Sequence, residues 1–391
     1  MILAAEMVFW TGAVALIYTY VGYPLLLTLI SRLRPRIVRR AEFTPTVSVI
    51  ITAYNEERAL AAKLENTLAL DYPQELLEII VASDCSTDHT DEIAAEFAAR
   101  GVRLHRQSER LGKTAAQNVA VEQARGEIVL FSDATTLYKQ DVMRVLLSNF
   151  ADTTVGCATG RVVYVDPAQT SVGHGTRSYW NYEFYVKKHE SSVCSLIGVC
   201  GCLYAVRRSA YVPLHHEACS DFIIATKMVE QGLRAVYEPD AVCTEETNQQ
   251  VHKELKTRVR IITQTLSDLC RHRAMMNPAR SGFYAVELLS HKVMRYLMPL
   301  FLMMLLLGSA WLAPQSIFYA VAMTTQLIFY GAAALAWILE RMGFHNRQLA
   351  IPQYFVLANL ASLIAFYKFL RGERYARWEP IRASAEQGVQ S

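Results

Sequence analysis

The stretch that decides the fold is Val47-Ser-Val-Ile-Ile-Thr-Ala-Tyr-Asn-Glu56, a β-branched apolar run that ends in polar residues. Such a run predicts a buried strand. The segment that follows, Glu56 to Leu70, has leucines at helical spacing. The alternation recurs, with strands expected over 76–82, 102–106 and 127–131 and helices over 88–100 and 113–125. It predicts an α/β fold, with a mostly parallel sheet and helices on both faces.

Polar and mostly acidic residues follow three of these expected strands. They are the runs from Thr52 to Glu56, from Ser83 to Asp88 and from Ser132 to Thr136. One acid, such as Asp88, could serve only as the N-cap of a helix. Ligands of open α/β sheets bind at the carboxyl ends of the strands, so three polar ends on one edge predict a functional cleft.

Two common phosphate-binding motifs are missing from the sequence. There is no glycine-rich dinucleotide fingerprint, and the run from Leu111 to Thr114 lacks the first glycine of a P-loop. These absences argue against hydride transfer and against ATP splitting. A cleft with carboxylates and few glycines would instead hold a nucleotide diphosphate through a divalent cation, which prefers oxygen ligands.

Four motifs in this order resemble family 2 glycosyltransferases of the GT-A fold, over about residues 44–275. They are the opening run from Val47 to Glu56, Ser83-Asp84-x-Ser-Thr-Asp-x-Thr90, Gly112-Lys-x-x-Ala-x-Asn118 and Phe131-Ser-Asp133. The membrane-bound members, such as cellulose, chitin and hyaluronan synthases, share this arrangement. The resemblance implies a GT-A nucleotide-diphospho-sugar transferase domain with flanking transmembrane helices.

On the donor side, the resemblance implies that Asp84 binds the nucleotide base and that Asp133 sits by the ribose and the metal-bridged diphosphate. It implies that Lys113 steadies the phosphates. Asp133 would also ligate the metal, Mg²⁺ or Mn²⁺, although Thr135 stands where the family has a second carboxylate. The remaining residues of the implied base pocket are Ala53, Tyr54, Asn55 and Glu56.

On the acceptor side, the resemblance implies that Asp221 is the catalytic base, with Ser220 in place of the family's preceding acid. The alternative is that Asp221 only caps a helix over 222–231. The run from Gly198 to Arg208 resembles the acceptor-side loop, in which Gly198 and Gly201 would allow close approach to a sugar. A plain turn is the alternative for this loop.

The last implied element is the family's Q-x-x-R-W motif. Here Arg260 would stabilise the leaving diphosphate, and Ile261 replaces the tryptophan. In the processive synthases that tryptophan supports the acceptor sugar, so its replacement argues against a processive enzyme. Arg258 lies outside the expected catalytic set, and a solvated or lipid-facing helix is the expected setting for it.

Composition predicts a membrane protein, because 52% of the residues are hydrophobic and only 19% are charged. One transmembrane helix is expected over 7–31 and two over 296–339, preceded by an interface helix over 282–296. The stretch 348–370 is expected to be re-entrant or interfacial, with a full span as the alternative. The resulting division is an anchor over 1–40, a GT-A domain over 41–276 and a helical region with a basic tail over 277–391.

Basic residues between Arg32 and Arg40 predict the orientation. Under the positive-inside rule they lie in the cytoplasm, which makes this a multi-pass protein of the inner membrane with a cytosolic catalytic domain. A net charge of +3 gives no reason to expect nucleic acid binding. Most of the eight cysteines fall in the cytosolic part and are expected as free thiols rather than disulfides. A zinc site of Cys194, Cys200, Cys202, Cys219, His215 and His216 has no common zinc spacing.

Taken together, the sequence predicts an inverting glycosyltransferase of the cell envelope. Its donor would be a nucleotide-sugar, by family habit a UDP-sugar, for hexosyl or N-acetylhexosaminyl transfer to a glycan or a lipid-linked acceptor. One alternative is a processive polysaccharide synthase coupled to translocation. Another is an inactive membrane scaffold, suggested by the departures at Thr135, Ser220 and Ile261. The sugar, the linkage, the acceptor and the oligomeric state stay open.

Overall fold

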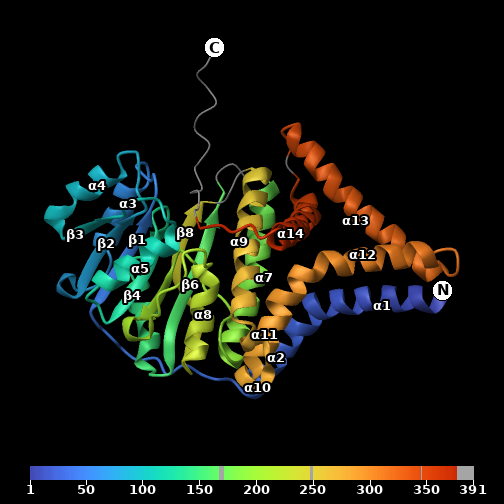
Figure 1. The fold of residues 1–391 in the computed structure, drawn as a ribbon, viewed down its shortest axis with the longest axis horizontal. Helices are drawn as coiled ribbons and strands as arrows, with labels where there is room; N and C mark the ends of the chain where they lie inside the picture. Colours follow the sequence, from blue (N-terminus) through green and yellow to red (C-terminus); the bar gives the residue numbers. More distant parts are fainter. Residues whose placement is uncertain (167–170, 247–249, 345, 377–391) are drawn as a thin grey trace, which may run out of the picture.

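The protein combines one large sheet with a group of long helices beside it (Figure 1). A computed structural model describes residues 1–166, 171–246, 250–344 and 346–376. The sheet has eight strands among these residues, in the order β3-β2-β1-β4-β7-β6-β8-β5. The expected basic tail beyond Tyr375 lies almost wholly outside the described residues.

The first half of the sheet confirms the four strands expected from the sequence. At its centre β1 (Val47–Ala53) pairs in parallel with β2 (Leu77–Ser83) and with β4 (Ile128–Asp133). Strand β3 (Val102–Arg106) extends the sheet beyond β2, again in parallel. The carboxyl ends of these strands therefore meet at one edge, as the polar strand ends required.

The second half of the sheet had no counterpart among the expected strands. Strand β7 (Tyr204–Arg207) runs antiparallel to β4 and β6 (Val155–Val165), and β6 pairs in parallel with β8 (Arg234–Glu246). A short strand, β5 (Leu137–Tyr138), closes this edge by pairing antiparallel with β8. Antiparallel pairs are confined to this half, so the sheet is mixed.

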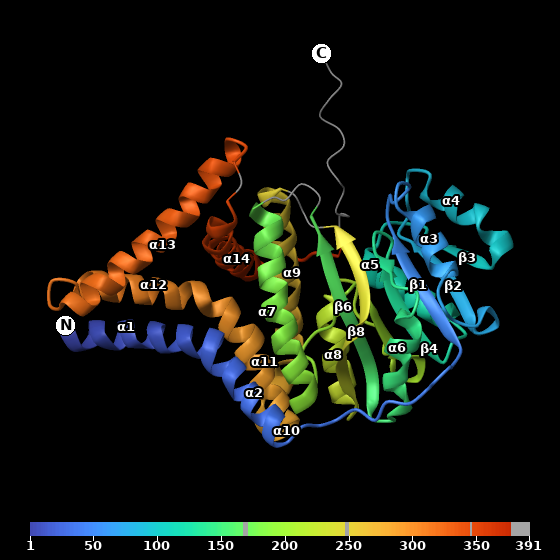
Figure 2. The same cartoon turned by 180° about the vertical axis from the view of Figure 1, so that it is seen from behind.

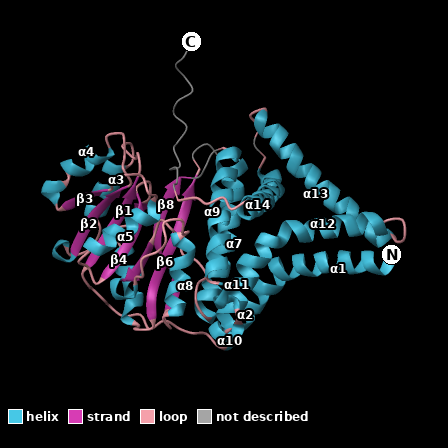
Figure 3. Cartoon of the chain, viewed as in Figure 1, coloured by secondary structure: helices cyan, strands magenta, loops and turns pink. Residues whose placement is uncertain are grey.

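Helices cover both faces of the sheet because its central strands present apolar residues to both sides. Val49 and Ile51 of β1 pack with Leu60 and Leu64 on one face, and Ile50 packs with Ala116 and other small residues on the other. The covering helices include α3 (Leu60–Leu68), α4 (Thr90–Glu96), α5 (Lys113–Gln123), α6 (Val142–Leu147) and α8 (Ser220–Glu230) (Figure 3).

Four helices of the described chain are long and apolar enough to cross a membrane: Ile2–Leu33, Phe283–Leu312, Ile317–Arg341 and Arg347–Leu370. The first consists of α1 (Ile2–Ile17), a π-helical turn (Tyr18–Gly22) and α2 (Tyr23–Leu33). The second consists of α11 (Phe283–Leu288), a π-helical turn (Leu289–Val293) and α12 (Met294–Leu312). The remaining two are α13 (Ile317–Arg341) and α14 (Arg347–Leu370).

Two expectations about this region need correction. The interface helix over 282–296 is not separate from the second span, because α11, its π turn and α12 form one continuous helix. Helix α14 is also unbroken from Arg347 to Leu370, with Pro352 inside it, whereas a re-entrant segment must reverse direction. The stretch is therefore one continuous helix, which leaves the interfacial and the spanning alternatives.

The long helices differ in direction. Helices α1 and α12 lie side by side across the view, whereas α14 is seen nearly end-on in both views (Figures 1 and 2). Glycines allow the close approach of α1 and α12, since a Cβ on Gly12 would lie 2.6 Å from the carbonyl oxygen of Phe301. Two further long helices, α7 (Ser171–Val193) and α9 (Val251–Arg271), stand between the sheet and α14.

Candidate active site

A cavity of about 720 Å³ lies at the carboxyl ends of β1, β4 and β8 and extends toward the long helices. Most of the side chains that the sequence singled out line it. They come from strand ends, helix starts and loops far apart in the sequence, and the fold brings them to one place. Of the predicted residues, the cavity is lined by Glu56, Lys113, Asp133, Gly198, Gly201, Asp221 and Arg260.

An ion pair between Lys113 and Asp133 lies on the sheet side of the cavity. Lys113 is the first residue of α5, Asp133 is the last residue of β4, and the Nζ–Oδ1 distance is 2.5 Å. Burial alone would lower the pKa of Lys113. The negative charges of Asp133 and Asp221 outweigh burial, so this pKa lies above its usual value and the ammonium stays charged.

The carboxylate of Asp221 faces the same cavity from the first turn of α8. The N-cap of α8 is Cys219 rather than Asp221, so the helix-cap alternative does not explain this side chain. Ser220 Oγ donates a hydrogen bond to Asp221 Oδ1 at 3.2 Å. The absent family acid is thus replaced by a hydroxyl that holds one carboxylate oxygen.

Gly201 packs directly against Asp221. A Cβ at position 201 would lie 2.3 Å from Asp221 Oδ2, which is far inside contact distance. The acceptor-side loop therefore has a glycine here because no side chain fits beside the carboxylate. The plain-turn alternative for this loop does not account for that contact.

We expect Gly201→Ala to lower kcat about 100-fold, because displacement of a reacting group by about 1 Å has an effect of this size. Gly198→Ala is the matched control, since its Cβ would lie 3.4 Å from the nearest atom, the carbonyl oxygen of Asp221. The measurement is kcat for both variants, with thermal unfolding to show that each is folded. Equal losses in the two variants would contradict a specific role of the Gly201 contact.

Glu245 is a cavity residue that sequence reasoning missed. It lies at the end of β8 and lines the cavity with Asp133 and Asp221. Burial and then the charge of Asp133 raise the pKa of Glu245 to about 8, although Lys113 lowers it. The adjacent acids Glu245 and Glu246 are the sequence signal for this part of the site. They indicate a site residue only because β8 is a strand that ends at this edge of the sheet.

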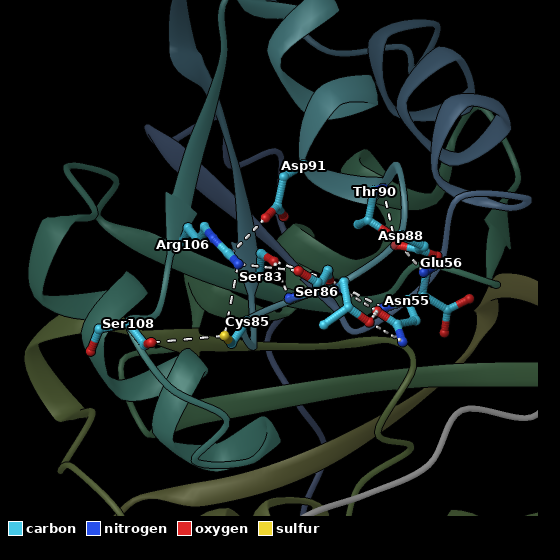
Figure 4. A network of polar contacts seen from close by, with 11 residues as sticks. Asn55, Glu56, Ser83, Cys85, Ser86, Asp88, Thr90, Asp91, Arg106 and Ser108 are labelled. Carbon is cyan, nitrogen blue, oxygen red and sulfur yellow. Dashed lines mark hydrogen bonds and ion pairs between the residues drawn. The ribbon is translucent and has the colours of Figure 1, made fainter.

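The loops after β1 and β2 bind each other through a polar network (Figure 4). Asn55 has a φ of 55°, and its backbone N–H donates to Ser86 Oγ at 3.1 Å. Thr87 N–H donates to Asn55 Oδ1 at 2.8 Å, and Glu56 N–H donates to Thr90 Oγ1 at 2.7 Å. The network fixes the backbone that follows β1, and with it the position of Glu56 at the cavity.

The implied base pocket is only partly assembled at the cavity. Asp84 is fully buried, and its carboxylate accepts from Gln107 Nε2 at 2.8 Å and from the N–H groups of Leu111 and Gly112 at 2.9 and 3.0 Å. It thereby positions the loop that leads into Lys113. Contact of Asp84 with a base stays a prediction, as does contact through Ala53, Tyr54 and Asn55, which are not among the cavity-lining residues.

Comparison with known proteins identifies the domain that carries this cavity. Residues 48–212 match the model of glycosyl transferase family 2. The chain contains a family 2 glycosyltransferase domain. This match spans the ends of β1, β2 and β4 and the acceptor-side loop, which are the elements that place Lys113, Asp133 and Gly201.

Curated relatives and a solved structure agree with this assignment. The chain is 26% identical over 204 residues to poly-beta-1,6-N-acetyl-D-glucosamine synthase of Staphylococcus aureus (strain COL), covering 50% of this chain and 49% of the relative. It is 32% identical over 132 residues to the probable glycosyltransferase YdaM of Bacillus subtilis (strain 168), covering 32% of this chain and 31% of the relative. The chain thus spans about half the length of the first of these relatives and less of the second.

Similarity to a solved structure extends beyond the matched residues 48–212. The mannosyltransferase PcManGT from Pyrobaculum calidifontis, solved in complex with GDP-Man and Mn²⁺, superposes with a TM-score of 0.71 at 24% identity, covering 93% of this chain and 99% of that chain. The family 2 domain therefore has the GT-A fold that the sequence implied, and the accompanying long helices share the neighbour's arrangement.

The residues at the last family motif and the arginine before them lie on the cavity wall. Arg260 and Ile261 of α9 line the cavity, and Arg258 lines it as well. Arg258 is neither solvated nor lipid-facing, which corrects the expectation for this residue. Its guanidinium lies 4.6 Å from the ring centres of both Tyr179 and Tyr354 and its Nε is 2.8 Å from Glu254 Oε1, so it joins α7, α9 and α14.

The cysteines of the described chain show no metal-binding arrangement. All eight are free thiols. Within the described residues, no group of three or more His, Cys, Asp and Glu side chains is placed to hold a metal ion. Any cation at this site would need ligands from a bound substrate as well.

Proposed function

We propose that this protein is an inverting glycosyltransferase that transfers a sugar from a nucleotide-sugar to a glycan or lipid-linked acceptor. The observation that carries the proposal is the convergence of Lys113, Asp133, Asp221 and Arg260 on one cavity of a family 2 domain. Two cations and two carboxylates suit a reaction in which a carboxylate removes a proton from the acceptor hydroxyl and cations stabilise the departing diphosphate.

In this mechanism Asp221 accepts the proton of the acceptor hydroxyl as that oxygen attacks the anomeric carbon. Ser220 holds one oxygen of the Asp221 carboxylate, and Gly201 leaves space beside it. Lys113 and Arg260 lie along the same cavity and stabilise the negative charge that develops on the departing diphosphate. A single displacement of this kind inverts the anomeric configuration.

The residues present fit a divalent cation, because the donor end of the cavity offers carboxylate and hydroxyl oxygens. Asp133 would be the first ligand, as the family resemblance implies. The second would be Glu245: β5 pairs with β8 through Leu137 and Thr244, and one further residue of this register brings Glu245 level with Thr136. Glu245 would thus replace the carboxylate that Thr135 lacks. When bound, Mg²⁺ or Mn²⁺ supplies positive charge that neutralises the diphosphate.

We expect Glu245→Gln to weaken Mn²⁺ binding in the presence of UDP by about ten- to a hundredfold, an effect typical of removing a group that supports a metal site. Electron paramagnetic resonance of free Mn²⁺ measures this binding without turnover. Glu109→Gln, at an exposed position, is the charge-matched control. Unchanged Mn²⁺ affinity in Glu245→Gln would exclude Glu245 as a metal ligand and leave Asp133.

The membrane arrangement is also a proposal. Several arginines between positions 32 and 40 lie between the first long helix and the GT-A domain. Under the positive-inside rule they place this domain in the cytosol. If α1, α12 and α13 cross the inner membrane, then α14, seen end-on beside them, lies near the plane of its surface (Figure 2). An in-plane α14 keeps Arg371 and Arg374 on the cytosolic side together with arginines 32–40.

The deciding experiment is nucleotide release by the detergent-purified protein from a panel of UDP-, GDP- and dTDP-sugars, with Mg²⁺, Mn²⁺ or chelator. We expect release from one donor class, lost in chelator, and strongest for UDP-sugars. Acceptor extracts from bacterial envelopes supply the second substrate. Failure of every donor to bind would reject the proposal in favour of the scaffold, and long polymeric products would favour the processive synthase.

A further inference from the structure

The cavity does not end at Asp221 but continues between the long helices. Beyond Asp221 its walls are formed by α7, α9, α14 and the two π-helical turns. Tyr18 of the first π turn and Ser290 of the second share a hydrogen bond of 2.7 Å, so these two turns pack against each other. Interruptions of this kind often occur at functional sites, because they redirect side chains. Residues of this inner half include Tyr20, Tyr179, Lys292, Arg295, Tyr296, Phe355 and Asn359.

Lys292 lies in the second π turn and lines the inner half. It belongs to a helix that is apolar enough to cross a membrane, where a charged side chain is costly and commonly has a function. Its ammonium makes no hydrogen bond or ion pair with any residue that the structure describes. Its aromatic neighbour is the ring of Phe222, 5.8 Å away, which follows Asp221 in α8.

Arg295, one helical turn further, presents a second cation to the same space. Its Nη1 is bound to Glu183 Oε2 at 2.7 Å. Its Nη2 is buried and has no hydrogen-bond partner among the described residues. A buried guanidinium nitrogen without an acceptor is costly, so a ligand that supplies one would be stabilised there.

We propose that Lys292 and Arg295 bind the phosphate group of a lipid-borne acceptor. This inference rests on the proposed function and deepens it, since it selects a lipid-linked acceptor over a free glycan. The donor end of the cavity has its own cation, Lys113, which is paired with Asp133. Lys292 instead lies near Phe222, the residue after Asp221, so the inner pair serves a separate anion.

The walls indicate a lipid as the source of the phosphate. Beside the two cations, the inner half is bounded by Tyr20 of the first membrane helix and by Ile351, Phe355 and Ala358 of α14. A soluble anion needs only the cations, whereas an acyl or prenyl chain also needs apolar side chains that continue into the membrane. The phosphate would lie at Lys292 and the chain would leave along α14.

The test uses the full chain in lipid nanodiscs, with farnesyl phosphate, farnesol and inorganic phosphate as probes and native mass spectrometry as the readout. We expect farnesyl phosphate to bind and Lys292→Gln to weaken its binding at least tenfold, as loss of a charge-assisted hydrogen bond predicts. Lys292→Arg should retain most of the binding. Lys188→Gln, at an exposed site on α7, is the control with the same charge change.

Each other outcome has a fixed meaning. Equal binding of farnesyl phosphate by wild type, Lys292→Gln and Lys292→Arg overturns the proposal, as does equal binding of farnesol. Inorganic phosphate that binds as well as farnesyl phosphate, and depends on Lys292, rejects a lipid in favour of a free anion. UDP and GDP binding is measured in the same samples. A wild-type protein that binds neither nucleotide would count against the proposed function, separately from the lipid result.

Discussion

Replacement of Asp221 by asparagine is expected to lower kcat by about 100- to 10,000-fold, the range typical of general acid–base catalysis. Asparagine has nearly the shape of aspartate, so it should still fit against Gly201, where there is no space for a Cβ. It lacks the negative charge that accepts the acceptor's proton. Donor KM should change little, because Asp221 acts on the acceptor.

The measurement is nucleotide release and glycosylated product, with donor and acceptor both saturating. Asp240→Asn, at an exposed position of β8, is the matched control and should keep full activity. If Asp221→Asn retains more than about a tenth of wild-type kcat, another group must take the proton. Glu245 would then be the next candidate, since it lines the same cavity.

Replacement of Lys113 by glutamine is expected to lower kcat/KM for the donor by about 100- to 1,000-fold, the size of effect seen when one preorganised charge-stabilising group is removed. Lys113 is held by Asp133, so its position is fixed before the diphosphate arrives. Its ammonium is also the positive charge that lowers the pKa of Glu245. Without Lys113, the carboxyl groups of Asp133 and Glu245 would share the donor end with less neutralising charge.

Lys113→Arg should recover part of this loss, because arginine keeps the charge but not the shape. Donor affinity is measured directly by titration with the nucleoside diphosphate, and kcat/KM by initial rates. A Lys113→Gln variant with unchanged nucleotide affinity and unchanged kcat/KM would show that Arg260 and the cation suffice for the leaving group. Circular dichroism distinguishes a folded variant from an unfolded one.

Several parts of the fold could be predicted because they depend on local patterns. The strands around Val49, Ile79 and Leu130 are mostly apolar runs, and such runs identify buried parallel strands. Gly101 follows the second helix with a φ of 88°, a conformation that favours glycine and that stops the helix where the sequence indicated.

Other parts could not be predicted because they depend on contacts between distant segments. The run from Val155 to Val165 becomes a central strand only through its pairing with β7 and β8, and local patterns do not report such partners. Glu245 acquires its place beside Asp133 through the same pairing. Arg258 had an ordinary helical setting in the sequence, and its contacts with two tyrosines from other helices make it a cavity-wall residue that links three helices.

The sequence by itself determined the fold class, the order of the motifs and the residue types at the strand ends, because strand and turn patterns act over a few residues. It also indicated the apolar segments long enough for a membrane. Only the tertiary structure decided that Gly201 touches Asp221, that Glu245 joins the donor end, and that Lys292 and Arg295 face a cavity continuous with the site. These relations join residues tens to hundreds of positions apart, and packing of the sheet and helices alone brings them together.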